Sequence, residues 1–466
     1  MDRDWMTAHL EAQKQQQAAS PDPSARVRRD RLLRAASALK THEADFVDAL
    51  AEDFNGRAAE VTLIADLAPS IHALKHAAKL VERWMKPQAR RVEAPLGLLG
   101  AKARVVLRPK GVVGIMSPWN FPVNLTFGPL AGVLAAGNRA MIKPSELCPN
   151  TSSLINTVVR AVFDPDEVAC VTGGADIAAD FSSLPFDHLI YTGGGAIGRK
   201  VMKAAAENLT PLTLELGGRC PAIVDRGANL ELAAKRIATG KLLNAGQVCL
   251  APNHVWVAQP QEDAFVSALC DVISQMYPAD GDASDYTGII HPRHLSRLED
   301  LIKAAEGDGA TVIWPAGRRK SETRLMPALV TDLTADSSIM QEEIFGPILP
   351  ILRFDSLDDV VNDIGRERWP LAIYPFMPDR ERRDRLMSRT LSGGVCMDDC
   401  LLHFSQENLP FGGAGQSGYG AYHGRAGFDE FSHAQSEFRQ IRSWDLLKIA
   451  RPPYSPKLSK MIKSRW

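Results

Sequence analysis

Between about residues 24 and 90, apolar positions recur at the spacing of amphipathic helices. Two sets of residues, each three or four positions apart, would line one face of a helix. Thr41 is a plausible N-cap for the second helix. The two sets are Leu32, Ala36 and Leu39, then Phe46, Leu50 and Phe54. This part of the chain is therefore predicted to be helical.

From Val112 onward the pattern changes to short β-rich runs separated by helix-length segments. The runs are VVGIM, AMIKP, VACVTGG, HLIYTGG and LTLELGG, and the segments between them include residues 125–136, 151–162 and 197–207. Such alternation predicts a doubly wound parallel sheet, which binds ligands at the carboxyl ends of its strands. A second α/β region is predicted to begin near Arg219 and to run past Cys400.

Length and charge narrow the classes of function. A chain of 466 residues has room for two or three domains, and 45% hydrophobic with 23% charged residues is an ordinary globular composition. The net charge of -1 gives no attraction to nucleic acid or to an anionic membrane. The N-terminus is polar, unlike a secretory signal, and prolines interrupt the most apolar window, residues 115–137. We expect a cytoplasmic protein without nucleic-acid or membrane partners.

The cysteines do not form a recognisable framework. There are seven, an odd number, and no C-x-x-C pair occurs, so reduced thiols are the better interpretation. His72 and His76 stand four positions apart, but no glutamate follows His72 as a zinc-protease motif requires. No metal site is predicted. The cysteines are Cys148, Cys170, Cys220, Cys249, Cys270, Cys396 and Cys400.

A glycine-rich stretch, YTGGGAIGRKV, follows a strand-like run and opens a predicted helix. Gly193, Gly195 and Gly198 spell G-x-G-x-x-G, a pattern that lets a phosphate approach backbone N–H groups at a helix N-terminus. A tight turn without a ligand is an equally common reason for such glycines. The stretch alone is a weak indication of a nucleotide site.

The stretch MIKPSE places a lysine at the end of a predicted strand. Pro144 would open a helix with Glu146 in its first turn, and the ammonium of Lys143 with this carboxylate could bind adjacent ribose hydroxyls. A helix start with an early proline and an acidic residue favoured by the helix dipole explains the same residues without a ligand.

Two further stretches carry candidate catalytic groups. In SPWNFP, two prolines hold a rigid corner from which the Asn120 amide could stabilise an oxyanion, although an ordinary turn residue is an alternative. In GKLLNAGQVCLAPN, Cys249 stands among small residues, 34 positions after the Glu215 of LELGG. The carboxylate is a weak base for a thiol but could activate a water once the thiol is acylated. A buried, inert cysteine and a solvated glutamate are the alternative.

Taken in order, the stretches described above and two further ones resemble the signature blocks of the aldehyde dehydrogenase superfamily over nearly the whole chain. Within it, LLHFSQENLPFGG, YHGRAGFDEFSH and WMKP are most similar to the dimeric class-three-like branch and, there, to coniferyl aldehyde dehydrogenases. The blocks are SPWNFP, KPSE, TGGGAIG, ELGG, GKLLNAGQVCLAP, QEEIFGPILP and LPFGGAGQSGYG.

The resemblance implies catalytic roles residue by residue. Cys249 takes the position of the nucleophile, Glu215 that of the general base, and Asn120 that of the oxyanion donor, with the backbone N–H of Cys249 as its partner. The implied reaction oxidises an aldehyde to the carboxylic acid through a cysteine thiohemiacetal and a thioester. An acylating enzyme that passes the thioester to coenzyme A would not need Glu215. A non-catalytic protein on the same fold would need none of the three residues.

The implied cofactor is NAD, with NADP as a possibility. Lys143 and Glu146 would meet the adenosine ribose, and Glu343 and Phe345 the nicotinamide ribose and ring. The chain departs from the family at Gly194 and Gly195, where the family commonly has hydroxyl residues, and at Asp398, where an asparagine is expected. The residues implied in cofactor binding are Trp119, Lys143, Ser145, Glu146, Gly193, Gly194, Gly198, Leu216, Glu343 and Phe345.

The resemblance also implies a domain plan for a homodimer: an α/β cofactor domain, an α/β catalytic domain and a small β oligomerisation flap. The implied bounds are 1–92 and 111–218 for the NAD-binding domain, 219–430 for the catalytic domain, 93–110 and 431–450 for the oligomerisation segment, and 451–466 for a basic tail.

The expected substrate is an aromatic or phenylpropenyl aldehyde such as coniferaldehyde. Trp119, Phe404 and Tyr419 could stack on its flat ring, or all three could simply pack the core. A medium-chain aliphatic aldehyde is the alternative, because an apolar funnel discriminates shape only weakly.

Overall fold

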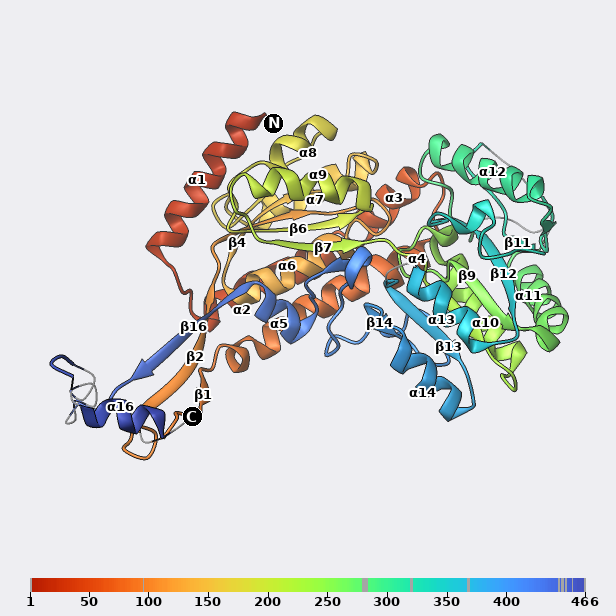
Figure 1. The fold of residues 1–466 in the computed structure, drawn as a ribbon. Coiled ribbons are helices and arrows are strands. Elements are labelled where there is room, and N and C mark those ends of the chain that lie inside the picture. The colour runs from red at the N-terminus through yellow and green to blue at the C-terminus, as the bar shows by residue number, and fades with distance from the viewer. Residues whose placement is uncertain are drawn as a thin grey trace.

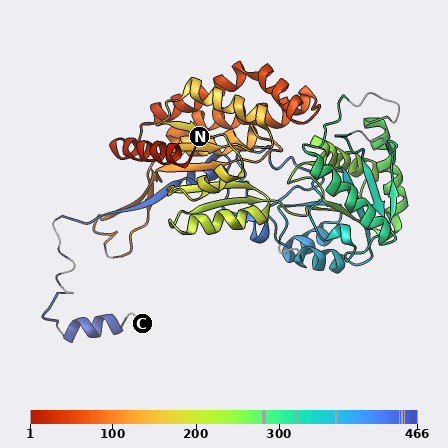
Figure 2. The same cartoon turned by 90° about the horizontal axis from the view of Figure 1, so that it is seen from above.

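The computed structural model contains three β-sheets, with helices packed around the two larger ones (Figure 1). The two larger sheets lie next to each other, and the smallest extends away from the body of the molecule (Figure 2). The structure describes residues 2–94, 96–278, 284–318, 322–366, 369–442, 445, 448, 451–454 and 456–464. Among these residues, no helix combines the length and the apolar character needed to cross a bilayer.

The first large sheet has the strand order β15-β7-β6-β3-β4-β5. Strands β7 to β5 of this order pair in parallel, and β15 joins the edge in antiparallel. The chain order reverses between β3 and β6, so the carboxyl ends of these strands are the expected place for a ligand. The strands are β3 (Val112–Met116), β4 (Arg139–Lys143), β5 (Val168–Cys170), β6 (His188–Gly193), β7 (Leu212–Leu216) and β15 (Gly418–Tyr419).

This sheet confirms the alternation of strand and helix that the sequence predicts. Every residue of β3 and of β4 is buried, because helices cover both faces of a parallel sheet. The predicted helical segments coincide with three of the covering helices, and α8 connects β5 to β6. These helices are α6 (Asn124–Ala136), α7 (Pro149–Val162), α8 (Ala175–Ser182) and α9 (Gly195–Ala206).

The N-terminal segment is helical, as predicted, and its apolar faces are fully buried. The predicted cap at Thr41 is wrong. Thr41 is the last residue of α2, where its hydroxyl donates to the carbonyl of Ser37, and His42 precedes the next helix. The helices are α1 (Arg3–Ala19), α2 (Ala25–Thr41), α3 (Glu43–Asp53), α4 (Ala59–Thr62) and α5 (Ala68–Trp84), with a π-helical turn at Leu63–Leu67 between the last two.

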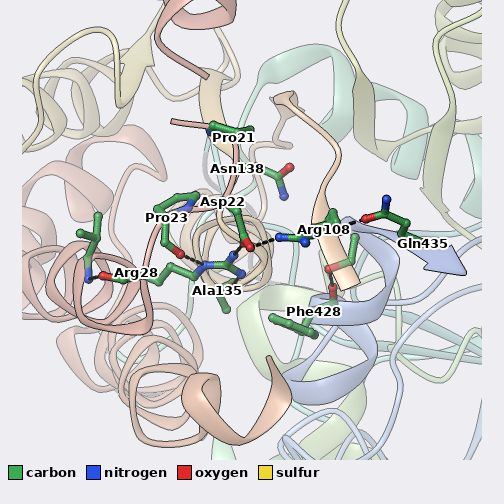
Figure 3. Close-up of polar contacts among 12 residues, drawn as sticks. Pro21, Asp22, Pro23, Arg28, Arg108, Ala135, Asn138, Phe428 and Gln435 are labelled. Atoms are coloured by element: carbon green, nitrogen blue, oxygen red, sulfur yellow. Dashed lines mark hydrogen bonds and ion pairs between the residues drawn. The ribbon is translucent and has the colours of Figure 1, made fainter. Parts of the chain in front are cut away.

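A buried arginine holds the C-terminal end of α6 (Figure 3). The guanidinium of Arg28 donates to the carbonyls of Pro23 at 2.8 Å and of Ala135 at 2.9 Å, and it pairs with Asp22 at 2.6 Å. Gly137 ends the helix in the left-handed conformation, and a Cβ there would collide with this guanidinium. Arg28 thereby satisfies a helix-end carbonyl that would otherwise be buried without a partner.

The second large sheet has the order β10-β11-β12-β9-β8-β13-β14, parallel except for the edge strand β10. This confirms the second α/β region. Its strands are β8 (Pro221–Val224), β9 (His254–Ala258), β10 (Thr311–Ile313), β11 (Ala328–Thr331), β12 (Ile348–Phe354), β13 (Ala372–Phe376) and β14 (Gly394–Val395). Its helices are α10 (Leu230–Leu242), α11 (Glu262–Met276), α12 (Pro292–Gly307), α13 (Leu357–Arg366) and α14 (Arg380–Arg389).

The third sheet consists of β1 (Gln88–Arg90), β2 (Lys102–Pro109) and β16 (Ser432–Arg439), all antiparallel. Strand β16 follows α15 (Gly424–Glu430) and forms one edge of this sheet. The tail helix α16 (Pro456–Lys463) lies beyond the sheet (Figure 2), and residues 465–466 of the predicted basic tail lie outside the described residues.

Candidate active site

A cavity of about 800 Å³ opens at the carboxyl ends of β3 and β6, where it faces the second large sheet. This is the place that the reversal of strand order indicates. Residues of the first large sheet line the cavity together with residues of α12 and of loops in the second α/β region, and most of the predicted site residues are among them. Those residues are Trp119, Asn120, Gly193, Gly194, Glu215, Leu216, Cys249, Glu343 and Phe345.

A strained turn delivers the thiol of Cys249 to this cavity. Helix α10 ends in a short 3-10 segment, Leu243–Gly246, in which Asn244 and Ala245 both have φ of 52°. Gly246 follows with φ of 75°, and a Cβ there would collide with the Gly346 carbonyl. Non-glycine residues with positive φ persist where function requires them. The turn places Cys249 half-buried at the cavity wall, whereas Cys148, Cys170 and Cys220 are fully buried. The thiol of Cys249 is therefore accessible from the cavity.

The surroundings of Cys249 favour the protonated thiol. Burial, then the charges of Glu343 and Glu215, raises its pKa to about 12, while the backbone N–H groups of Cys249 and Leu250 act in the opposite direction. A thiolate is the nucleophilic form of cysteine. Neutral carboxyl groups at Glu343 and Glu215 would remove two of the causes that raise the pKa of the thiol and would favour the thiolate.

Glu215 lies on β7, directly opposite Gly418 of β15 in the sheet register. Its side chain is 3% exposed, and neither carboxylate oxygen has a hydrogen-bond partner among the described residues. Burial raises the pKa of Glu215 well above its usual value, and the charge of Glu430 adds to this effect. A carboxylate of raised pKa with unoccupied oxygens is suited to accept a proton from water near neutral pH.

Hydrogen bonds fix Asn120 at the cavity. Its side-chain Nδ2 donates to the backbone carbonyl of Gln247 at 3.1 Å, and its backbone carbonyl accepts from Arg57 Nη1 at 3.2 Å and from Asn244 Nδ2 at 3.1 Å. An amide nitrogen carries two hydrogens, so one N–H remains for a ligand. The geometry suits a preorganised donor to an oxyanion.

The Glu343 carboxyl group lies against the turn that follows β7. The backbone N–H of Gly218 donates to it, and a Cβ on Gly217 would collide with it. Its Oε1 has no partner among the described residues, and burial raises its pKa to about 7. Phe345, at φ of 48°, meets Trp119 edge-to-face with ring centroids 5.3 Å apart. This part of the cavity offers one carboxyl oxygen without a partner among the described residues, together with two aromatic rings, to a ligand.

The glycine-rich turn fits the phosphates of a dinucleotide. Gly194 caps α9 without a side-chain hydrogen bond, so the first N–H groups of this helix are open to an anion. A Cβ on Gly194 would meet nothing within 4 Å, so the family's hydroxyl residues are missing here for no steric reason. A Cβ on Gly193 would collide with the Tyr191 hydroxyl, and one on Gly198 would crowd Leu216. These two glycines are therefore required by packing.

Lys143, Ser145 and Glu146 lie at the carboxyl end of β4 and are not among the residues that line the cavity. Pro144 does not open a helix as predicted, because residues 144–148 form a turn and α7 begins at Pro149. Lys143 Nζ donates to the Pro144 carbonyl at 2.8 Å and lies 3.9 Å from Glu146 Oε2. The buried ammonium and the half-exposed carboxylate are thus close together, as a ribose site requires.

Sequence reasoning missed several residues of the cavity wall. Phe411, Leu125, Leu371 and His294 line it. Phe411 stands in the LPFGG block, where it could have been found. Of the three aromatic residues predicted to meet a substrate ring, Trp119 lines the cavity, whereas Phe404 packs against Phe411 and His423, with ring centroids 4.8 and 4.7 Å apart. Tyr419 is 42% exposed on the edge strand β15.

The departure from the family at Asp398 has a structural explanation. Asp398 has φ of 57°, a conformation in which asparagine and aspartate are both tolerated, so the exchange does not disturb the backbone. No group of three or more potential metal ligands occurs in the described part of the chain, and no disulfide joins any of the seven cysteines.

One cavity thus holds a half-buried thiol, a buried carboxyl of raised pKa, an amide with a free N–H and the N-terminus of α9. This combination suits a nicotinamide-dependent oxidoreductase that acts through a covalent intermediate. The model of the aldehyde dehydrogenase family matches residues 2–436, and the chain belongs to this family. It is an NAD(P)-dependent aldehyde dehydrogenase.

Individual relatives agree with this assignment. A probable coniferyl aldehyde dehydrogenase of Caulobacter vibrioides is 46% identical, over 97% of this chain and 95% of the relative. A coniferyl aldehyde dehydrogenase of Pseudomonas sp. strain HR199 is 42% identical, over 92% of this chain and 89% of the relative. Among solved structures, the substrate-bound state of Staphylococcus aureus AldH is 33% identical, with a TM-score of 0.92 and 99% of each chain covered.

Proposed function

We propose that Cys249 is the nucleophile, Asn120 the oxyanion donor and Glu215 the base of a hydrolytic aldehyde dehydrogenase. The observation that supports this most strongly is that the three side chains line the same cavity, although they come from β7, from the loop after β3 and from the turn after α10. The cofactor, when bound, accepts the hydride of the substrate.

The first half of the reaction takes place at the thiol. The thiolate of Cys249 attacks the aldehyde carbon, and the carbonyl oxygen becomes an oxyanion that accepts hydrogen bonds from the free N–H of Asn120 and from the backbone N–H of Cys249. A preorganised donor of this kind contributes roughly 3–4 kcal/mol to the stabilisation of the transition state. Loss of hydride from the thiohemiacetal leaves a thioester on Cys249.

The second half requires water activation. Glu215 takes a proton from a water, the hydroxide attacks the thioester carbon, and the acid leaves as the thiolate of Cys249 is restored. The two unpartnered oxygens of Glu215 support this role. An enzyme that passes its acyl group to coenzyme A would not need a water-activating carboxylate in this position, so the hydrolytic reaction is favoured.

We further propose that NAD is preferred to NADP. In the proposed ribose site, the Glu146 carboxylate would accept hydrogen bonds from the ribose hydroxyls of NAD and would repel the additional phosphate of NADP. The measurement is kcat/KM with each cofactor for the wild type and for Glu146→Gln. The substitution should reduce the ratio of kcat/KM with NAD to kcat/KM with NADP. Equal or better kcat/KM with NADP in the wild-type enzyme would reject the preference.

The proposed substrate class is an aromatic or phenylpropenyl aldehyde. Trp119 and Phe411 provide flat apolar surfaces in the cavity, and Leu125 and Leu371 add to them. The two coniferyl aldehyde dehydrogenases described above support the same class. Aliphatic aldehydes are the alternative substrates, because one methylene group changes the free energy of discrimination between two substrates by only about 1–3 kcal/mol.

The test of the substrate class compares kcat/KM for coniferaldehyde, benzaldehyde and hexanal on the purified protein. We expect coniferaldehyde to be preferred, and Phe411→Leu should lower kcat/KM for coniferaldehyde more than for hexanal. A tenfold preference for hexanal, about 1.4 kcal/mol, would reject the aromatic class without touching the dehydrogenase activity.

We propose that the three-stranded sheet joins a homodimer and that the predicted domain plan holds. Strand β16 is an edge strand with mostly exposed residues, and Phe438 on it is 54% exposed. Unpaired edges are usually covered. Sedimentation should give twice the chain mass, and Phe438→Glu should shift it toward the monomer. Leu209→Glu, an exposed apolar residue at the end of α9, is the matched control. A wild-type monomer would reject the proposal.

A further inference from the structure

A fully buried ion pair lies behind the loop that carries Asn120. Arg57 stands in the connection between α3 and α4, and Asp66 stands in the π-helical turn between α4 and α5. Their side chains are both 0% exposed, with Arg57 Nη2 2.7 Å from Asp66 Oδ2. Neither residue belongs to a cavity wall of the active site, so the pair has no direct access to a substrate.

Asp66 caps helix α6 from outside. The first residue before this helix, Val123, has no side-chain capping bond. Instead, Asp66 Oδ1 accepts the backbone N–H of Val123 at 3.1 Å and that of Asn124 at 2.9 Å. Helix N-termini leave such N–H groups unsatisfied, and a carboxylate suits the positive end of the helix dipole. The carboxylate thus fixes the C-terminal end of the loop 117–123.

Arg57 reaches the middle of the same loop. Its Nη1 donates to the carbonyl of Asn120 at 3.2 Å while Nη2 pairs with Asp66. The rings of Phe54 and Phe121 lie on the guanidinium, each with its centroid 5.1 Å from the central carbon. One planar group therefore ties the peptide of Asn120 to the carboxylate that holds the end of the loop.

The nucleophile turn holds Asn120 from its other side. Asn244 Nδ2 donates to the same Asn120 carbonyl at 3.1 Å, and Asn120 Nδ2 donates to the Gln247 carbonyl at 3.1 Å. The direction of the remaining N–H of Asn120 thus depends on Arg57 and on the turn that delivers Cys249. A misplacement of about 1 Å in such a group can cost about 100-fold in rate.

Stability alone does not explain this arrangement. Burial lowers the pKa of Arg57 and raises that of Asp66, so both charges carry a desolvation penalty. Replacing a buried ion pair by packed apolar side chains is often neutral or stabilising. Single-turn π-helices such as the one that carries Asp66 also occur frequently at functional sites.

We propose that Arg57 and Asp66 are a positioning pair that aligns the Asn120 amide with the developing oxyanion, a role that rests on the proposed function of Asn120. The pair acts on the acylation step through Asn120 and touches neither substrate nor cofactor. Arginine is required because its planar fork serves two acceptors at once, whereas a lysine ammonium is a single point charge on a flexible stem.

The experiment compares Arg57→Lys and Asp66→Asn with the wild type in stopped-flow measurements of the first turnover at saturating cofactor. Arg57→Lys keeps the charge beside Asp66, and Asp66→Asn keeps an acceptor for the α6 N–H groups. We expect the burst rate to fall about 10- to 100-fold, with KM within about twofold and the rate of Cys249 alkylation by iodoacetamide unchanged. A wild-type burst rate in both folded variants would overturn the proposal.

Arg28→Lys is the matched control, because Arg28 is equally buried and holds the opposite end of α6 (Figure 3). It should lower the unfolding temperature and leave the burst rate unchanged. The double variant with Asn120→Ala then separates the two proposals. If Asn120→Ala is slow and Arg57→Lys slows it no further, the pair acts through Asn120. Additive effects would overturn this inference alone. A fast Asn120→Ala variant would overturn the role of Asn120 itself, and this inference with it.

Discussion

Replacing Asn120 with alanine should slow the acylation of Cys249 by about 100- to 1000-fold. The magnitude follows from the count of available donors. One N–H of the Asn120 amide is used by the Gln247 carbonyl at 3.1 Å, which leaves a single side-chain donor for the oxyanion. The loss of one such donor costs about 2.7–4 kcal/mol, and each 1.36 kcal/mol is tenfold in rate.

The same change should have a small effect on stability. The Gln247 carbonyl would lose its bond from Asn120 but would keep that from Asn244 Nδ2 at 3.4 Å. A net hydrogen bond contributes about 1 kcal/mol to the free energy of unfolding. KM for the aldehyde should change little, because the oxyanion forms only after the attack. Asn120→Asp, of equal size, exchanges the donor for an acceptor beside the Gln247 carbonyl and should be at least as slow.

The assay is the first-turnover burst of reduced cofactor in a stopped-flow instrument, at saturating cofactor and aldehyde. A slower burst of full amplitude is expected, with the folded fraction checked by the unfolding temperature. The reasoning would be refuted by a burst within about threefold of the wild-type rate. A raised KM at unchanged burst rate would also contradict it, since it would place Asn120 in ground-state binding.

Three further outcomes are expected. Cys249→Ala should abolish turnover and keep the fold, whereas Cys170→Ala, which removes a buried thiol on β5 that does not line the cavity, should stay active; residual turnover in the first variant would disprove that Cys249 is the nucleophile. Glu215→Gln should release one equivalent of reduced cofactor rapidly and then turn over slowly; loss of the burst would place Glu215 before the thioester. Burial lowers the pKa of Lys241 to about 7. Between pH 7 and about 10.5 this lysine therefore binds a proton in the unfolded chain but not in the folded one. The stability of the wild type should rise with pH over this range. Lys241→Met should remove this rise in unfolding temperature, and an unchanged rise would contradict it.

The strands were predictable because burial determines them so strongly. A parallel sheet covered on both faces needs continuous apolar runs, and β3 and β4 are buried at every position. The proposed catalytic residues could be selected for a different reason. Cys249, Glu215 and Asn120 stand in local blocks whose resemblance to one family implies their roles, and all three line the cavity.

The failed details depended on local alternatives that a sequence does not separate. Thr41 and His42 are both polar and adjacent, and in the structure the Thr41 hydroxyl donates back to the Ser37 carbonyl of α2 instead of capping the next helix. Pro144 and Pro149 both suit the start of a helix. The helix begins at Pro149, because Lys143 still belongs to β4 and Glu146 lies in the turn that follows this strand.

The residues that tie the site together were beyond sequence reasoning because their contacts cross the fold. Arg57 and Asp66 stand nine positions apart, in a stretch whose pattern indicates only helices, and their targets lie near residue 120. Asn120 and Glu215 come from the first large sheet, and Cys249 from the turn before the second. The proposed reaction needs these groups in fixed relative positions, so we expect the hydrogen bonds that join the loop of Asn120 to the turn of Cys249 to matter more for catalysis than for folding. Substitutions along this line should therefore show in kcat before they show in the unfolding temperature.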